Sequence, residues 1–327
     1  YLASRHHARS TTILGRTGLR VSARKSSFYF HGKALPARQI GESLGVANVV
    51  EASLRQVGSR LRITAQLIRV ADASNLWSAS YDRELAGPLD VLTVQEEVAR
   101  AIAKALEVKL ALPSVPRVDN PEAYELYLKG RMLWNRGTEE GFTQALKFFS
   151  AAIAKDSTYA RAYAGLADTY IVLWVQEYLT RAEAYPKARG AAERAVALDS
   201  LLPEGYAARG RLRSLEWNWS GADQDLRRAV TLNPGDALAH RWYAVTLTRR
   251  GRAAESLQEA SRARELDPLS AQVMATYAEA FLYARQYGRA AEHYRKLLEL
   301  EPRRPQAHQR LAMVYVQQDK FADALRE

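Results

Sequence analysis

Apolar and small residues recur with a fixed period over the C-terminal two thirds of the chain. An apolar residue, an acid or amide, and proline stand together at 232–234, 266–268 and 300–302, at intervals of 34 residues. Residues 198–200 hold the same place one interval earlier, with serine instead of proline. Because proline cannot continue a helix, each motif is expected to follow the second helix of a helix–turn–helix unit. The period therefore predicts a stack of helical pairs.

The sizes of particular residues within each interval favour close packing of the two helices. With the proline counted as position 32, position 8 is small in four successive units: Gly210, Ala244, Ala278 and Ala312. Position 11 is large and apolar in three units and arginine in one: Leu247, Phe281, Tyr315 and Arg213. Gly251 and Gly288 are expected in the turns between paired helices. An alanine-rich helical bundle is the alternative, but it would not require the exact repetition of one interval.

These spacings resemble the tetratricopeptide repeat, and the resemblance runs over about residues 121–327. It implies an all-α solenoid of about six repeats. The first repeat has a longer turn at 138–141, and the second has an insertion at about 177–185. The sixth stops at Glu327 inside its second helix. We therefore expect a truncated last repeat and a longer natural protein, since the ends of a solenoid need a polar cap.

In the first third of the chain, apolar and polar residues alternate instead of recurring at the 34-residue period. Apolar and polar residues predict strands at 46–57 and 60–71, with a tight turn at Gly58–Ser59 between them. A third strand is expected at 76–81. Residues 19–24 and 26–30 are also expected to be extended.

Two helices complete the prediction for this part of the chain. Residues 36–44 are expected to form a short helix that begins at Pro36 and ends at Gly45. An apolar stripe at 89–110 predicts one long helix. Prolines at 113, 116 and 121 then indicate a linker over residues 113–120. The predicted fold class is an α+β N-terminal domain over residues 1–112, followed by the all-α solenoid.

Four ordered stretches, 18–28, 40–46, 62–68 and 76–84, resemble the TolB amino-terminal-like (FlgO-like) α/β domain. In bacterial signalling proteins this domain precedes tetratricopeptide repeats. The resemblance implies a non-catalytic interaction and regulatory module of such a protein. The alternatives are the C-terminal regulatory part of a class III nucleotide cyclase, of a Ser/Thr kinase or of a winged-helix transcription regulator. Residues 4–12 lack the acidic amphipathic helix usual in this family, through divergence or a frameshift.

The net charge of +11 is concentrated at the N-terminus, because residues 1–41 carry eight Lys/Arg and no acid. The repeats have mixed charge, so we expect no nucleic-acid binding by this segment. The absence of cysteine excludes disulfides, thiolate catalysis and cysteine-ligated zinc. No apolar run is long enough to span a membrane. The cytoplasm is the expected compartment, or the periplasm if a transmembrane helix precedes the segment.

No catalytic motif is present. The sequence lacks the glycine-rich phosphate-binding loops, the serine nucleophile elbow and the H-E-x-x-H zinc motif. We therefore expect no enzyme activity, no metal and no cofactor in this chain. His240 and His308 share position 4 of a repeat and are interpreted as packed helix residues. Trp217 and Trp219 are interpreted as packing at a repeat turn, with ligand stacking as the alternative.

The resemblance to tetratricopeptide repeats implies a groove lined by the first helix of each repeat. We predict that it binds a protein or peptide partner, and an acidic partner would suit its arginines. The residues predicted to contact the partner are Arg211, Arg241, Arg249 and Tyr283. The alternative is that these arginines are solvated or paired with neighbouring acids.

Overall fold

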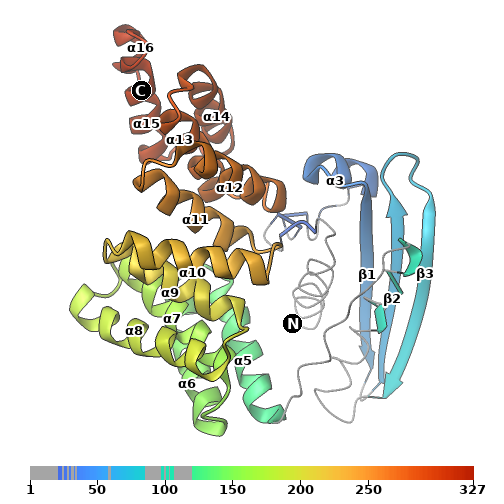
Figure 1. Cartoon of the computed structure of the whole chain (residues 1–327). Helices are drawn as coiled ribbons and strands as arrows, with labels where there is room; N and C mark the ends of the chain where they lie inside the picture. The colour runs from blue at the N-terminus through green and yellow to red at the C-terminus, as the bar shows by residue number, and fades with distance from the viewer. Residues whose placement is uncertain are drawn as a thin grey trace.

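The computed structural model describes residues 21–23, 26–27, 29–30, 33, 35–57, 60–84, 97–98, 101–102, 104–106 and 120–327. Its larger part is a stack of paired helices, and a small antiparallel sheet stands beside the stack (Figure 1). From residue 120 onward the chain consists of helices and the turns that connect them, as the 34-residue period predicts.

Six helical pairs follow one another along the stack. The first helices are α5 (Pro121–Trp134), α7 (Ala160–Val175), α9 (Pro203–Leu215), α11 (Ala237–Arg249), α13 (Ala271–Tyr283) and α15 (Pro305–Val316). The second helices are α6 (Glu139–Lys155), α8 (Arg181–Leu198), α10 (Trp219–Leu232), α12 (Ala253–Leu266), α14 (Tyr287–Leu300) and α16 (Phe321–Ala324). Successive first helices pack against each other, whereas contacts between successive second helices are weaker throughout residues 120–327. The stack therefore curves toward its first helices, and their exposed surface is called the inner face below.

Each helical pair turns through one residue in the left-handed backbone region. These residues are Gly137, Glu177, Trp217, Gly251, Arg285 and Asp319. Gly251 was expected in such a turn, and its φ of 73° confirms this. The same expectation for Gly288 is wrong. Gly288 lies in the first turn of α14, and Arg285, with a φ of 57°, reverses the chain there.

The small residues of the repeats lie where helices approach most closely. A Cβ atom at Gly210 would lie 2.7 Å from Cγ of Leu226, so only glycine fits without displacing that side chain. Ala244 and Ala278 are fully buried. The sequence-based expectation of a small residue at this position is therefore confirmed in the third, fourth and fifth pairs.

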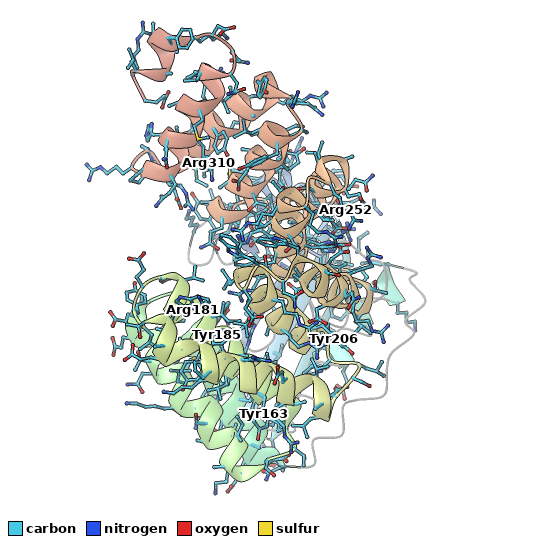
Figure 2. All side chains as sticks on the ribbon, turned by 60° about the vertical axis from the view of Figure 1, so that its left-hand side comes forward. Tyr163, Arg181, Tyr185, Tyr206, Arg252 and Arg310 are labelled. Atoms are coloured by element: carbon cyan, nitrogen blue, oxygen red, sulfur yellow. The ribbon has the colours of Figure 1, made fainter. Side chains whose placement is uncertain are left out.

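A buried carboxylate joins the third and fourth pairs. Asp223 of α10 accepts hydrogen bonds from Arg250 and Arg252, at 2.6 and 3.0 Å; Arg252 is labelled in Figure 2. Arg227, one turn along α10, also pairs with Asp223 at 3.2 Å. Because Asp223 is only 7% exposed, these arginines compensate a charge that the core could not otherwise hold.

The sheet has three antiparallel strands in the order β1-β2-β3: β1 (Asn48–Val57), β2 (Arg60–Arg69) and β3 (Asn75–Glu84). Val57 lies opposite Arg60, so β1 and β2 form the predicted hairpin. Its turn, Gly58–Ser59, lies outside the described residues. The predicted third strand is confirmed and is longer than expected. The short helix is α3 (Ala37–Leu44), with Pro36 as its N-cap and Gly45 as its left-handed C-cap.

One face of the sheet is buried. Ile63, Ala65 and Leu67 point to this face, where they pack against Val98 and Ile102. Residues 97–98, 101–102 and 104–105 are helical, and the rest of the helix predicted at 89–110 lies outside the described residues. The alternation in β2 therefore identified the buried side correctly.

The extended conformation expected at 26–30 is wrong. Ser26 and Ser27 are helical, and Tyr29 and Phe30 lie in a turn. Residues 21–23 of the other expected extended segment form no strand in the described structure. The cause is a tertiary contact. The Ser26 hydroxyl donates to Asp267 at 2.5 Å and accepts from the Leu269 backbone N–H at 3.0 Å, which ties this segment to the turn between α12 and α13.

Candidate functional site

Arg211 is held inside the solenoid. Its side chain extends from α9, is 3% exposed and donates from Nη1 to Oδ1 of Asp168 on α7 at 2.6 Å. Burial raises the pKa of Asp168, although the attraction of Arg211 opposes this shift. Arg211 therefore links two successive first helices, and its charge already has a partner.

Arg241 lies beside Arg211 but has no acidic partner. Its guanidinium stands 4.7 Å above the ring of Trp242, and that of Arg211 lies 5.0 Å from the centre of the same ring. Arg241 forms no ion pair or hydrogen bond with any described residue, and its Nε is buried without a partner. Burial, followed by the nearby charges of Arg211 and Arg304, lowers the pKa of Arg241 to about 9. The charge of Glu279 opposes this shift, but no carboxylate forms an ion pair with Arg241 within the described structure.

Two other arginines of the first helices lie near carboxylates. Although burial opposes it, Glu204 raises the pKa of Arg161 above its usual value. Arg310 of α15, labelled in Figure 2, pairs with Glu279 of α13 at 3.1 Å. Arg241 therefore differs from Arg310, which forms an ion pair with a carboxylate.

Arg249, at the C-terminal end of α11, also lies against a tryptophan, but unlike Arg241 it is exposed. Its guanidinium lies 5.4 Å from the ring centre of Trp219, and it forms no ion pair within the described structure. The Trp219 ring is nearly parallel to that of Trp217, with 6.5 Å between their centres and 19° between their planes. Tyr283 ends the next first helix, α13, and is half exposed. Arg249, Tyr283 and the two tryptophans thus mark one rim of the inner face.

Trp217 departs from the packing role that its sequence context suggests. It is 77% exposed and has a φ of 65°, a conformation that costs a bulky residue free energy. Trp219 is partly buried at the start of α10, as expected. Trp242 was not singled out from the sequence, although its place directly after Arg241 could have suggested an aromatic support for that side chain.

We expect Trp217→Gly to leave the free energy of unfolding unchanged or to raise it by up to about 1 kcal/mol. Glycine relieves the left-handed strain, and an indole that is 77% exposed contributes little packing. Chemical denaturation of the whole chain measures the change. Trp219→Gly is the matched control and should destabilise the chain, since it removes partly buried surface from the first residue of α10. A loss well above 1 kcal/mol for Trp217→Gly would contradict this assignment.

The two histidines at position 4 of their repeats have a shared structural role. His240 contacts Oε2 of Glu259 at 2.5 Å and the Pro234 carbonyl at 3.1 Å. His308 makes the equivalent contacts with Glu327 at 2.7 Å and with the Pro302 carbonyl at 3.0 Å. Each imidazole therefore ties a first helix to the preceding turn; His240 also contacts the second helix of its pair, and His308 contacts the segment after α16.

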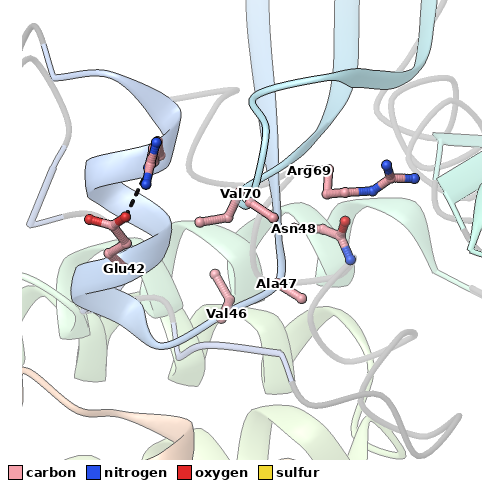
Figure 3. Close-up of a pocket in the computed structure, with 8 residues that line it drawn as sticks. Glu42, Val46, Ala47, Asn48, Arg69 and Val70 are labelled. Atoms are coloured by element: carbon pink, nitrogen blue, oxygen red, sulfur yellow. Dashed lines mark hydrogen bonds and ion pairs between the residues drawn. The ribbon is translucent and has the colours of Figure 1, made fainter.

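Outside the inner face, a cavity of about 520 Å³ lies where α3 meets the sheet (Figure 3). Its charged lining is the exposed pair of Arg38 and Glu42, at 3.0 Å, together with Arg69, which pairs with Asp72. The described residues contain no cluster of three or more metal-ligating side chains. No helix in this part of the chain is both long and apolar enough to cross a bilayer.

Comparisons with known proteins identify the repeats. The tetratricopeptide repeat family matches residues 281–327. The crystal structure of PilW, described as a widely conserved type IV pilus biogenesis factor, superposes with a TM-score of 0.52 at 15% identity. This superposition covers 63% of this chain and 90% of PilW, and it is a likeness of fold alone. Residues 281–327 thus match the tetratricopeptide repeat, and residues 120–327 have the fold of a helical solenoid.

Two curated relatives share part of the sequence. The chain is 32% identical over 196 residues to "Putative adenylate cyclase 3" of Rhizobium meliloti (strain 1021), which covers 58% of this chain and 33% of that protein. It is 21% identical over 179 residues to "Transcriptional regulator HilA" of Salmonella typhimurium, which covers 54% of this chain and 32% of the regulator. The chain thus spans about a third of the length of these relatives.

Proposed function

We propose that this chain is a non-catalytic scaffold whose inner face binds a protein or peptide partner. The observation that carries the proposal is Arg241, which forms no ion pair within the described structure and is held against Trp242 with its Nε buried and unpartnered. A cation that is partly removed from water and forms no ion pair is costly, and a carboxylate supplied by a partner would reduce that cost. Arginine and aromatic residues are also the side chains that most often dominate protein interfaces.

The contacts of the four residues predicted from the sequence favour three of them for direct contact with the partner. Arg241 and Arg249 have no acidic partner and remain the first candidates for contact, with Tyr283 beside them. Arg211 is engaged by Asp168, so it supports the position of Trp242 and of Arg241 rather than meeting the partner itself.

The module serves, in our proposal, as a regulatory part of a bacterial multidomain signalling protein. The partial match to a protein named as an adenylate cyclase supports a cyclase as the parent, and the match to HilA supports a transcription regulator. The three-stranded sheet with α3 would be the TolB-like part of the module. The coding sequence upstream of Tyr1 distinguishes these parents, because a cyclase, a kinase and a winged-helix domain have different catalytic or DNA-binding motifs.

The test is recovery of partners from the source cell by the immobilised chain. Arg241→Met/Arg249→Met removes both arginine charges and keeps much of each aliphatic stem against its tryptophan. We expect this variant to lose partners that the wild type retains, and we expect wild-type binding to weaken with added salt because exposed charges are screened. The matched control is Arg228→Met/Arg303→Met, which removes two exposed arginines elsewhere. Equal recovery by all three proteins would contradict binding through the inner face.

A further inference from the structure

Arg241 and Arg249 form a matched pair on one helix. Both belong to α11, eight residues apart, and such residues lie on the same side of a helix with about 12 Å between them along its axis. Each guanidinium lies over an indole, Arg241 over Trp242 at 4.7 Å and Arg249 over Trp219 at 5.4 Å. Neither has an acidic partner in the described structure. The inner face thus offers two oriented cations at a fixed separation.

We infer that this pair reads two carboxylates of one extended acidic peptide, carried four residues apart in the peptide sequence. The inference rests on the proposed function and names the chemistry of the partner. An extended chain rises about 3.3 Å per residue, so four residues span about 13 Å, close to the separation of the arginines. Side chains four residues apart also lie on the same side of an extended chain, so both carboxylates can face α11.

An extended ligand fits this surface better than a helical one. A bound amphipathic helix needs an apolar groove, with apolar contacts at successive turns. Across residues 203–283, the large apolar side chains that are exposed are Trp217 and Tyr283. Near Arg241 the inner face carries charged groups instead, such as Glu279 in its ion pair with Arg310. Such a surface suits a peptide that is held by its carboxylates.

The two exposed aromatic residues add a third feature of the ligand. Trp217 follows the end of α9 and Tyr283 ends α13, so they flank Arg249 at the end of α11. Trp217 is 77% exposed and Tyr283 is 50% exposed, so both side chains can contact a bound peptide. The peptide should therefore carry an apolar residue next to the carboxylate that meets Arg249.

Fluorescence anisotropy with short labelled peptides tests the spacing. Each peptide has two glutamates and one leucine beside the second, in a serine and threonine background, and only the separation of the glutamates changes. We expect glutamates four residues apart to bind about tenfold more tightly than adjacent ones, because charged hydrogen bonds to one arginine are lost in the latter. Arg241→Met and Arg249→Met should each abolish this preference, whereas Arg228→Met should preserve it. Trp217→Gly should weaken binding of the preferred peptide without lowering the melting temperature.

Equal affinity for every spacing, or the same preference in the Arg241→Met and Arg249→Met variants, overturns the inference. The recovery of cellular partners by the immobilised chain then shows whether the proposed function still holds. If the peptides show no preference but the Arg241→Met/Arg249→Met variant still loses cellular partners, the inner face binds by another chemistry and the proposed function stands. If that variant also keeps all partners, both fail.

Discussion

Ala278→Trp is expected to lower the free energy of unfolding by about 3 kcal/mol, because overpacking a tight core costs this much when backbones cannot separate. Ala278 is fully buried in the fifth pair, within a cluster that includes Phe281, Ala290 and Tyr294. An indole there would have to displace α14 from α13. Ala244→Trp should act similarly in the fourth pair. Urea denaturation followed by circular dichroism measures both.

Ala312→Trp is the control for this prediction. Ala312 holds the same position of the sixth pair but is partly exposed, at the edge of a surface cavity. The substitution there should therefore cost much less than at Ala278. If both fully buried alanines accept tryptophan with no change in stability, the assignment of position 8 to the closest helix contact is wrong.

Asp168→Ala is expected to lower the free energy of unfolding by about 3–5 kcal/mol, since it leaves a buried guanidinium without its carboxylate. The two side chains of this ion pair are 4% and 12% exposed, so water cannot replace the missing carboxylate. The double variant Asp168→Leu/Arg211→Met should recover most of this loss, because apolar residues of similar size often replace a buried pair without penalty. Equilibrium denaturation of the two single variants and the double variant gives the coupling energy.

The double variant also separates the two interpretations of Arg211. With a structural role, it should be near wild type in stability and should retain its partners, apart from a small change through Trp242. If it is stable but loses every partner that depends on Arg241, Arg211 contacts the partner directly and the structural assignment fails.

The repeats could be predicted because their constraints are local and recur. Position 8 is small where the two helices of a pair touch, and a proline follows the second helix in the third, fourth and fifth pairs. Whether an individual side chain forms an ion pair depends on residues that are distant in the sequence. Arg211 and Arg241 were both predicted to line the groove, yet Arg211 pairs with Asp168, 43 residues earlier, and Arg241 forms no ion pair within the described structure.

The incorrect predictions for Ser26 and Trp217 also arise because their structure depends on residues distant in the sequence or on the turn that holds them. Ser26 lies in an alternating stretch that favours an extended conformation, but its hydroxyl bonds with Asp267, 241 residues away. Trp217 was interpreted as a packing residue because large apolar residues are usually buried. Its turn needs a left-handed residue, and in that conformation the indole points to solvent. Neither the hydrogen bond of Ser26 nor the exposure of Trp217 can be deduced from residues nearby in the sequence.

Site-specific photocrosslinking tests most directly whether the inner face binds the partner. A photoreactive phenylalanine analogue replaces Tyr283 or Gln309, which are exposed on the first helices α13 and α15, or Arg228 or Lys296, which are exposed on the second helices α10 and α14. Binding at the inner face predicts adducts with cellular partners from Tyr283 and Gln309, and their loss in the Arg241→Met/Arg249→Met background. Adducts from Arg228 and Lys296 alone, unchanged in that background, would contradict it.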